Sequence, residues 1–210
     1  MGKTGHIKKC LERDSGKCQK CGKNNVLLDV HHKIPYRCFI NRKDAHHIDN
    51  LITLCRKCHF IEEAKKNLIN IRIGKECKIW NYTNLYGCEL GNNVSVGSFT
   101  EIGPNVIIGD NVTIGAHSFI PEGFTIEENV FLGPNFLGIN DRYPPSPKDK
   151  WEKTVIKKGA RIGASVTVMC GITIGEGAIV GAGSLVIKDV MPNVVVIGNR
   201  TRNETLRKFV

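Results

Sequence analysis

The sequence predicts a mainly β protein, in which a long parallel β-helix follows a small cysteine-rich α+β unit. From Ile73 onward an aliphatic residue recurs at every sixth position, usually followed by glycine. This period is typical of a coil built from three short strands per turn. In contrast, residues 1–70 hold six of the nine cysteines and six of the seven histidines. We therefore expect two domains, residues 1–70 and residues 71–210.

The hexapeptide register predicts which side chains face the interior of the coil. One aliphatic side chain per strand is expected to point inward, and stacked coils then bury a continuous core. The stretch 84–90 is irregular, because it puts Asn84 at an inward position with Leu85 beside it. The expected inward residues are Ile73, Ile79, Leu90, Val96, Ile102, Ile108, Ile114, Ile120, Ile126, Leu132, Ile156, Ile162, Val168, Ile174, Val180 and Val186.

The repeat is interrupted once, by a segment of roughly residues 139–154 that is rich in proline. Proline cannot donate a hydrogen bond to a strand ladder, so this segment is expected to leave the sheets. The interval from Leu132 to Ile156 is a multiple of six, so the coil should resume in phase. Long loops in compact domains are usually functional, which makes this loop a candidate part of an active site.

The basic character of the chain belongs to its first segment. Residues 1–70 carry 15 Lys and Arg against 7 Asp and Glu, which leaves 15 against 13 for the rest. No apolar leader opens the sequence, and no apolar run approaches the ~18 residues of a membrane span. We expect a soluble, cytoplasmic protein with no membrane partner, whose cysteines are metal ligands or free thiols rather than disulfides.

Two C-x-x-C pairs mark a metal site in the first segment. This spacing lets both thiolates of each pair reach one tetrahedral ion. Two such pairs within 70 residues predict a structural zinc site, and four buried free cysteines are the alternative. The predicted ligands are Cys18, Cys21, Cys55 and Cys58.

The residues around these pairs resemble the HNH nuclease family from Arg13 to Lys66, a ββα-metal fold. The resemblance rests on Asp29-Val-His-His before Lys33, on Asn50-Leu, and on His59 after the last cysteine. The resemblance implies that His32 is the general base and that Asn50 is the orienting residue. It also implies that His31 and His59 hold a second divalent metal. The interval from His32 to Asn50 is longer than usual, and His46 and His47 within it are expected to be solvated. The alternatives are an active nuclease and a zinc-stapled module that does not cut.

The coil resembles the left-handed β-helix of the hexapeptide acyltransferases, and within them the N-acetyltransferases of nucleotide-linked amino sugars. The resemblance covers about 125 residues. It is carried by Ile79-Trp-Asn-Tyr-Thr-Asn-Leu-Tyr-Gly, Phe131-Leu-Gly-Pro-Asn, Gly138-Ile-Asn-Asp-Arg-Tyr-Pro and Val155-Ile-Lys-Lys-Gly-Ala-Arg-Ile-Gly. It implies a homotrimer that binds acetyl-CoA between neighbouring coils and builds the sugar site from two subunits.

The chemistry of acetyl transfer to an amine needs few groups, mainly for orientation and for stabilising the oxyanion. Asn140 and Asp141 on the extruded loop are the candidates for holding the sugar amine. His117, the one histidine after residue 70, is the candidate base, with an outward-facing surface histidine as the alternative.

The end of the chain is expected to hold the coenzyme. Small residues at Gly181 and Ala182 would let pantetheine lie against the backbone, and Lys188 follows them. The segment Gly198-Asn-Arg-Thr-Arg stands where the family usually has Gly-Asn-Pro-Ala followed by Arg or Lys, so Arg200 replaces a proline. Arg202 is the candidate partner of the coenzyme phosphates, and a solvated charged tail is the alternative.

These observations together predict an acetyl-CoA-dependent N-acetyltransferase whose substrate is a dTDP- or UDP-linked amino sugar. The competing hypothesis is a metal-dependent nuclease or nucleic-acid-binding protein, with the coil as a trimerising scaffold. The net charge of the first segment would suit phosphate backbones.

Overall fold

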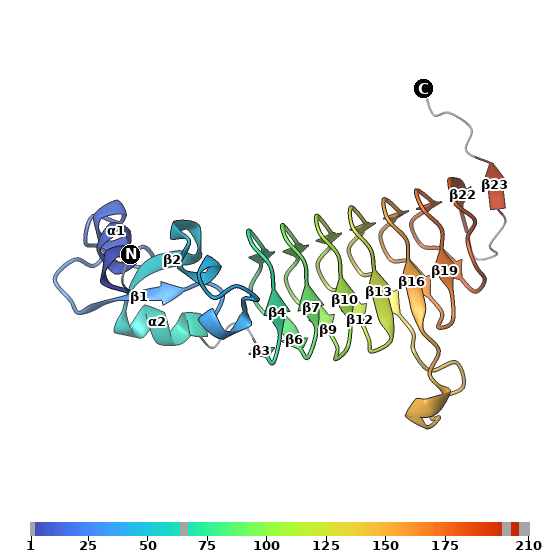
Figure 1. Ribbon diagram of the computed structural model, residues 1–210, viewed down its shortest axis with the longest axis horizontal. Coiled ribbons are helices and arrows are strands. Elements are labelled where there is room, and N and C mark those ends of the chain that lie inside the picture. Colours follow the sequence, from blue (N-terminus) through green and yellow to red (C-terminus); the bar gives the residue numbers. More distant parts are fainter. Residues whose placement is uncertain (1–2, 64–66, 199–202, 206–210) are drawn as a thin grey trace.

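The computed structural model describes residues 3–63, 67–198 and 203–205, and it consists of a small mixed unit followed by a β-solenoid (Figure 1). The small unit contains α1 (Lys3–Arg13), the antiparallel hairpin β1 (Leu28–His32) and β2 (Leu51–Cys55), and α2 (Arg56–Glu63). Three short 3-10 turns, Tyr36–Cys38, Asp44–His46 and Ile48–Asn50, lie between β1 and β2. Among the described residues no helix is long and apolar enough to cross a membrane.

Three sheets form the faces of the solenoid. From β3 to β21 successive strands enter successive sheets, and each strand pairs in parallel with the third strand along the chain. The six-stranded sheet holds β4 (Arg72–Ile73), β7 (Glu89–Leu90), β10 (Ile107–Ile108), β13 (Phe124–Ile126), β16 (Thr154–Ile156) and β19 (Thr173–Ile174). The seven-stranded sheet holds β3 (Asn67–Ile69), β6 (Asn84–Tyr86), β9 (Glu101–Ile102), β12 (Phe119–Ile120), β15 (Leu137–Gly138), β18 (Thr167–Val168) and β21 (Leu185–Val186).

The eight-stranded sheet completes the solenoid. It holds β5 (Lys78–Ile79), β8 (Ser95–Val96), β11 (Thr113–Ile114), β14 (Phe131–Leu132), β17 (Arg161–Ile162), β20 (Ile179–Val180), β22 (Val194–Val196) and β23 (Asn203–Thr205). Its last strand, β23, pairs antiparallel with β22. The mainly β class and the parallel solenoid are therefore as the sequence predicts.

The core of the solenoid confirms the predicted inward positions, all of which are buried. It also contains a second buried row that the single-position pattern missed. In most rungs the residue two places before each inward aliphatic is buried as well, as at Val94, Val106, Val112 and Val130. The irregular rung is corrected, because Leu85 is fully buried and fills the core there while Asn84 lies only half-buried.

The extruded loop leaves the solenoid after β15 and rejoins it at β16, and Figure 1 shows it projecting from the side of the coil. It contains one 3-10 turn, Lys148–Lys150. On its return, Ile156 pairs with Ile126 and later with Ile174, so the predicted phase is confirmed.

The small unit covers the first coil of the solenoid. The segment between β1 and β2 contributes four residues, Ile34, Cys38, Phe39 and Ala45, to the same buried cluster as the coil core. Phe39 forms a parallel bridge with Ile73, and the Ile40 N–H donates to the Ile73 carbonyl at 2.9 Å. Ile73 lies in β4, the end strand of its sheet, so an edge that would otherwise be open is paired.

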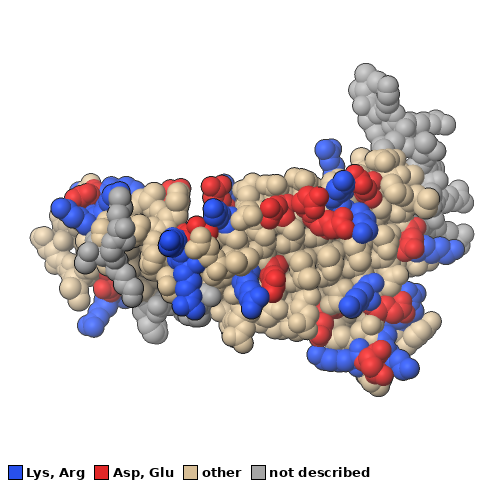
Figure 2. All heavy atoms as spheres, viewed as in Figure 1, with Lys and Arg blue, Asp and Glu red and all other residues tan. Residues whose placement is uncertain are grey.

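Charged side chains of both signs lie over the visible face of the coil in Figure 2. Several form ion pairs between neighbouring coils, such as Lys157 with Glu127 at 2.9 Å and Lys158 with Glu176 at 3.2 Å. These exposed pairs contribute little individually to stability. The solenoid therefore depends mainly on its buried core and its backbone ladders.

Candidate functional site

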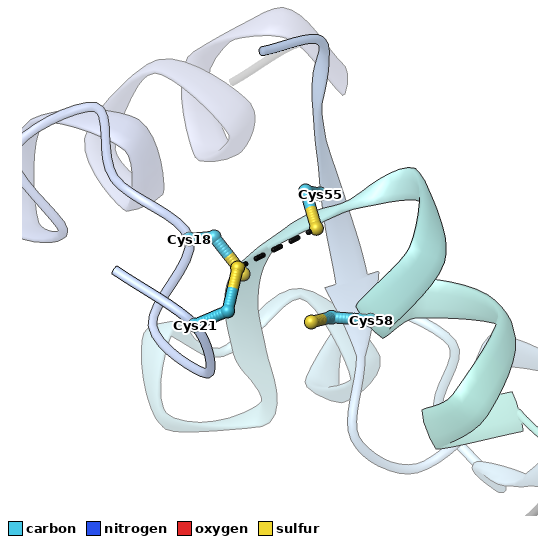
Figure 3. Close-up of side chains that lie close together, drawn as sticks. All are labelled: Cys18, Cys21, Cys55 and Cys58. Atoms are coloured by element: carbon cyan, nitrogen blue, oxygen red, sulfur yellow. Dashed lines mark hydrogen bonds between the residues drawn. The ribbon is translucent and has the colours of Figure 1, made fainter. Parts of the chain in front are cut away.

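The four predicted zinc ligands meet at one point of the small unit (Figure 3). Cys18 and Cys21 lie on a tight turn after α1, in which the Gly22 N–H donates to the Cys18 carbonyl at 2.8 Å. Cys55 ends β2 and Cys58 lies in the first turn of α2. The four Sγ atoms all lie within 4.8 Å of one another. Four thiolates are a common ligand set of structural zinc, so the donor set fits a structural zinc site.

The electrostatics of the cysteine cluster favour a bound cation. Burial opposes ionisation of Cys18, but backbone N–H donors from Cys55, Cys21 and Lys20 lower the pKa of its thiol to about 6. Burial and the neighbouring sulfurs raise the pKa of Cys58 to about 12. The thiols cannot all ionise together without a compensating charge, and a zinc ion supplies that charge.

The first and last histidines of the HNH-like set lie beside each other. The His31 and His59 rings meet edge to face, with their centroids 4.7 Å apart. His59 Nδ1 also lies 3.3 Å from Asp29 Oδ2. A carboxylate in this position orients an imidazole. In the described part of the chain, however, only the four cysteines bring three or more ligand groups close enough for one ion.

The second histidine, His32, has a partner that the sequence analysis did not assign. Its Nε2 lies 3.2 Å from Nδ1 of His46, and the His46 ring stacks on His6 with the centroids 5.3 Å apart. The expectation that His46 is a solvated insertion residue is therefore wrong, whereas His47 is largely exposed. Burial, together with His46, lowers the pKa of His32, so its imidazole is neutral near pH 7.

Asn50 has a structural role in this conformation. Its side-chain oxygen accepts the Ile34 N–H at 2.9 Å, and its amide nitrogen donates to the carbonyls of Ile34 at 3.0 Å and Ala45 at 2.8 Å. Asn50 thus closes the segment between β1 and β2 into a compact loop. That segment carries the residues that cover the solenoid.

A buried cluster that no sequence motif marked ties α1 to the hairpin. The Asp14 carboxylate accepts hydrogen bonds from Arg13 Nε at 2.7 Å and from the Thr53 N–H at 2.8 Å. Arg13 also donates to the carbonyl of Leu51 at 2.8 Å. The Arg13 guanidinium holds the pKa of Asp14 well below its usual range.

His117 lies on the surface of the solenoid, at a corner between β11 and β12. It is exposed and has a left-handed backbone, with φ of 59°. Its ring stacks on Phe99 with centroids 4.8 Å apart, and Phe99 stacks on Tyr82 at 5.1 Å. The three residues occupy the same corner of three successive coils. We call this set the corner row.

The two candidate residues on the extruded loop, Asp141 and Asn140, differ in their hydrogen bonding. The Asp141 carboxylate accepts hydrogen bonds from Ser146 Oγ at 2.6 Å, from the Ser146 N–H at 2.8 Å and from the Tyr143 N–H at 3.1 Å. The hydrogen bonds from Ser146 lower the pKa of Asp141. The same hydrogen bonds connect two parts of the loop and stabilise its shape. Asn140 is half-buried, and its side chain has no hydrogen-bond partner among the described residues.

One chain does not bring the candidate transferase residues together. His117 lies where the chain enters the seven-stranded sheet, whereas Asn140 and Asp141 follow β15 where it leaves that sheet. The two groups therefore lie at opposite edges of one face. Gly181 and Ala182, between β20 and β21, share the edge of His117, and Lys188 follows β21 on the other edge. Arg200 and Arg202 lie outside the described residues.

Both parts of the chain match known family models. A model described as bacterial transferase hexapeptide (six repeats) matches residues 87–122 and 153–188. The HNH endonuclease model matches residues 18–65. The solenoid thus matches the hexapeptide model over two stretches, and the small unit matches the HNH endonuclease model over most of its length. We call the small unit the HNH-like module.

Known relatives share the coil. The bifunctional protein GlmU of Carboxydothermus hydrogenoformans is 32% identical over 144 residues, which are 68% of this chain and 30% of that protein. The chain therefore spans about a third of the length of that curated relative. A variant of AntD, an N-acyltransferase from Bacillus cereus, in complex with dTDP and coenzyme A is 25% identical, with a TM-score of 0.52, over 69% of this chain and 84% of that one. A second AntD variant, in complex with dTDP-4-amino-4,6-dideoxyglucose and coenzyme A, is 25% identical, with a TM-score of 0.51, over 68% and 83%.

Proposed function

We propose that the protein is an acetyl-CoA-dependent N-acetyltransferase that acts on the amino group of a nucleotide-linked sugar. The observation that carries the proposal is the extruded loop with Asn140, inserted in phase into a hexapeptide coil. The similarity of this coil to AntD, which was solved with coenzyme A and a dTDP-linked amino sugar, supports the substrate class. The nine free cysteines fit a reducing compartment, so we place the protein in the cytoplasm.

In the proposed reaction the sugar amine attacks the thioester carbonyl of acetyl-CoA. A C–N bond forms, the C–S bond breaks, and the amine proton passes to a base or to the departing thiolate. Asn140 orients the amine by hydrogen bonding, and Asp141 keeps the loop in the shape that presents Asn140. His117 is the proposed base, with Gly181, Ala182 and Lys188 along the coenzyme and Arg200 and Arg202 near its phosphates.

The separation of these residues within one chain supports a site shared between two copies. An edge that carries His117 and Gly181 in one copy would face the loop with Asn140 of its neighbour in a homotrimer. The buried indole N–H of Trp151 on the loop, which has no partner among the described residues, is also consistent with a missing neighbour or substrate.

Mixing two inactive variants tests this arrangement directly. We expect Asn140→Ala and His117→Ala each to lower kcat/KM by about 10² or more, with acetyl-CoA binding nearly unchanged for Asn140→Ala. Co-expression of the two should restore about a quarter of the sites if each site uses one residue from each of two copies. A mixture as inactive as its components would place both residues in one chain. A fully active His117→Ala variant would remove His117 from the chemistry.

The substrate class has its own test. The purified protein should release CoA thiol when given acetyl-CoA with a dTDP- or UDP-linked 3-amino or 4-amino sugar, and not with the corresponding hydroxyl sugar. Absence of release across the whole panel would contradict the proposal. Full activity in a monomeric preparation, measured by light scattering with the assay, would contradict the shared site.

The HNH-like module has a second candidate function, metal-dependent cleavage of DNA. The contact between His31 and His59, beside the neutral His32, favours it. The engagement of both ends of the Asn50 amide weighs against a role of Asn50 in orienting His32 or water. If the module cuts, Mg²⁺- or Mn²⁺-dependent nicking of plasmid DNA should disappear in His32→Ala with zinc content unchanged. No nicking by the wild type with several divalent metals would leave a binding or structural module.

A further inference from the structure

The first coil of a solenoid has an open end, which exposes its core and leaves strand edges unpaired. Here the segment of residues 33–50, which we call the cap segment, covers that end. Phe39 is 7% exposed and lies in the same buried cluster as Ile71 and Ile73 of the coil. Its bridge with Ile73 adds backbone pairing to this apolar contact. The cap segment therefore performs the task of a terminal repeat.

Both ends of the cap segment are anchored on the HNH-like side. It starts at the end of β1 and ends at the start of β2, where His32 pairs with Leu51. Three hydrogen bonds of the Asn50 side chain, two donated and one accepted, fasten the two halves of the cap segment together. At the opposite end of the same hairpin, Leu28 pairs with Cys55, a predicted zinc ligand. A five-residue ladder thus links the cysteine cluster directly to the base of the cap segment.

The apolar contacts around the cysteines are too few to hold this hairpin alone. The buried cluster there consists of Cys18, Leu54, Cys55 and Cys58, with Leu28 and Ile52 partly buried against it. Three of its four buried members are the predicted metal ligands themselves. In units of this size a bound zinc ion can supply most of the folding free energy.

We propose that this arrangement makes the metal site control the stability of the transferase coil. Loss of zinc from the four cysteines releases the hairpin and the cap segment, and the first coils, β3 to β9, then open locally. The later coils, β17 to β22, keep their structure because each repeat contacts only its neighbours. The HNH-like module is in this respect a metal-dependent end cap.

Amide hydrogen exchange of the full-length protein, read residue by residue, tests the proposal. The first-coil reporters are the N–H groups of Arg72 and Gly74, which donate to Cys88 and Leu90. The distant reporters are those of Arg161 and Gly163, which donate to Ala178 and Val180. Removing zinc with a chelator should speed exchange of the first pair by about tenfold or more and leave the second pair within about twofold. Adding zinc back should reverse the change.

A variant with the metal site intact separates the cap from the metal. Phe39→Ala should speed exchange at the first-coil reporters while the zinc content stays the same, and Ile34→Val provides a milder change of the same kind. Ile40→Ala is the matched control, because the Ile40 side chain is 64% exposed and the substitution keeps the backbone N–H that donates to Ile73. First-coil exchange that stays unchanged on zinc removal, or in both cap variants, would overturn the proposal.

Discussion

The two parts of this chain reach stability in opposite ways. The solenoid repeats one small unit, and each added rung extends a continuous core of aliphatic side chains. The HNH-like module has a small apolar cluster and depends on four cysteines that a metal ion can join. We therefore expect the repeat to tolerate local damage, and the module to fail as a unit when its cysteine site is lost. The predictions below test that difference, beginning with the largest expected effect.

Removal of one predicted zinc ligand should have the largest effect. Cys55→Ser should unfold the module, because a structural zinc can contribute on the order of 10 kcal/mol to such a unit. Metal analysis should find zinc lost, while circular dichroism should retain the β signal of the solenoid. A wild-type protein that contains no zinc would contradict the prediction.

The buried carboxylate of Asp14 should come next. Asp14→Asn should destabilise the module by about 3 kcal/mol, because the carboxylate accepts charge-assisted hydrogen bonds from Arg13 and one from the Thr53 N–H. The Arg13 side chain is 37% exposed, so solvent screens the ionic part of this interaction. The folded-state pKa of Asp14 lies below its ordinary value, so this stabilisation is present above about pH 4. It should be lost as the pH falls below that value. Acid unfolding of the module at the same pH in wild type and variant would show that Asp14 is not responsible.

A glycine of the coil should show a smaller effect that stays local. A Cβ on Gly133 would lie 2.6 Å from the backbone nitrogen of Ala164 in the next coil, so Gly133→Ala should destabilise the solenoid by about 2–3 kcal/mol. Gly183 is the matched control. Its φ is +71° but no atom lies within 4 Å, so Gly183→Ala should lower the free energy of unfolding by about 1 kcal/mol. Equal effects in denaturant unfolding would contradict close coil contact as the cause.

The corner row should give the smallest effect. Phe99→Asn removes stacking with Tyr82 and His117, which is worth about 0.5–1.5 kcal/mol per pair. It also relieves backbone strain, because asparagine tolerates the positive φ at this position better than phenylalanine does. We expect a net change within about 1 kcal/mol. The reverse change, Asn111→Phe, brings the strain without an aromatic neighbour and should destabilise by about 1 kcal/mol. A larger loss for Phe99→Asn in thermal unfolding would show that the row is a main support of the coil.

Much of the solenoid was readable from its period. Buried aliphatics must recur at the spacing of the rungs, so the inward residues and the phase after the loop followed from counting. The second buried row was missed because valine, serine, threonine and phenylalanine share it, and no single residue type marks it. Asn84 was misplaced because the rung of Leu85 is shifted by one residue. The left-handed winding stays a prediction from the resemblance.

The candidate sites were readable only in part. The C-x-x-C pairs predict a metal site from spacing alone, because two thiolates three residues apart can bind the same ion in any fold. The partners of His32 and Asn50 were not readable, since His46 and Ala45 reach them only through the path of the cap segment. Likewise, His117 and Asn140 could be predicted as candidates from the sequence, but their separation across one face of the solenoid could not.

The sequence by itself determined the parallel solenoid, the in-phase loop and the cysteine cluster, because each depends on short-range spacing. The tertiary structure alone decided that the module covers the open end of the coil through Phe39 and Ile73. It also decided that the candidate transferase residues lie on opposite edges of one sheet. Both are consequences of where distant segments pack, and local spacing carries no information about such packing.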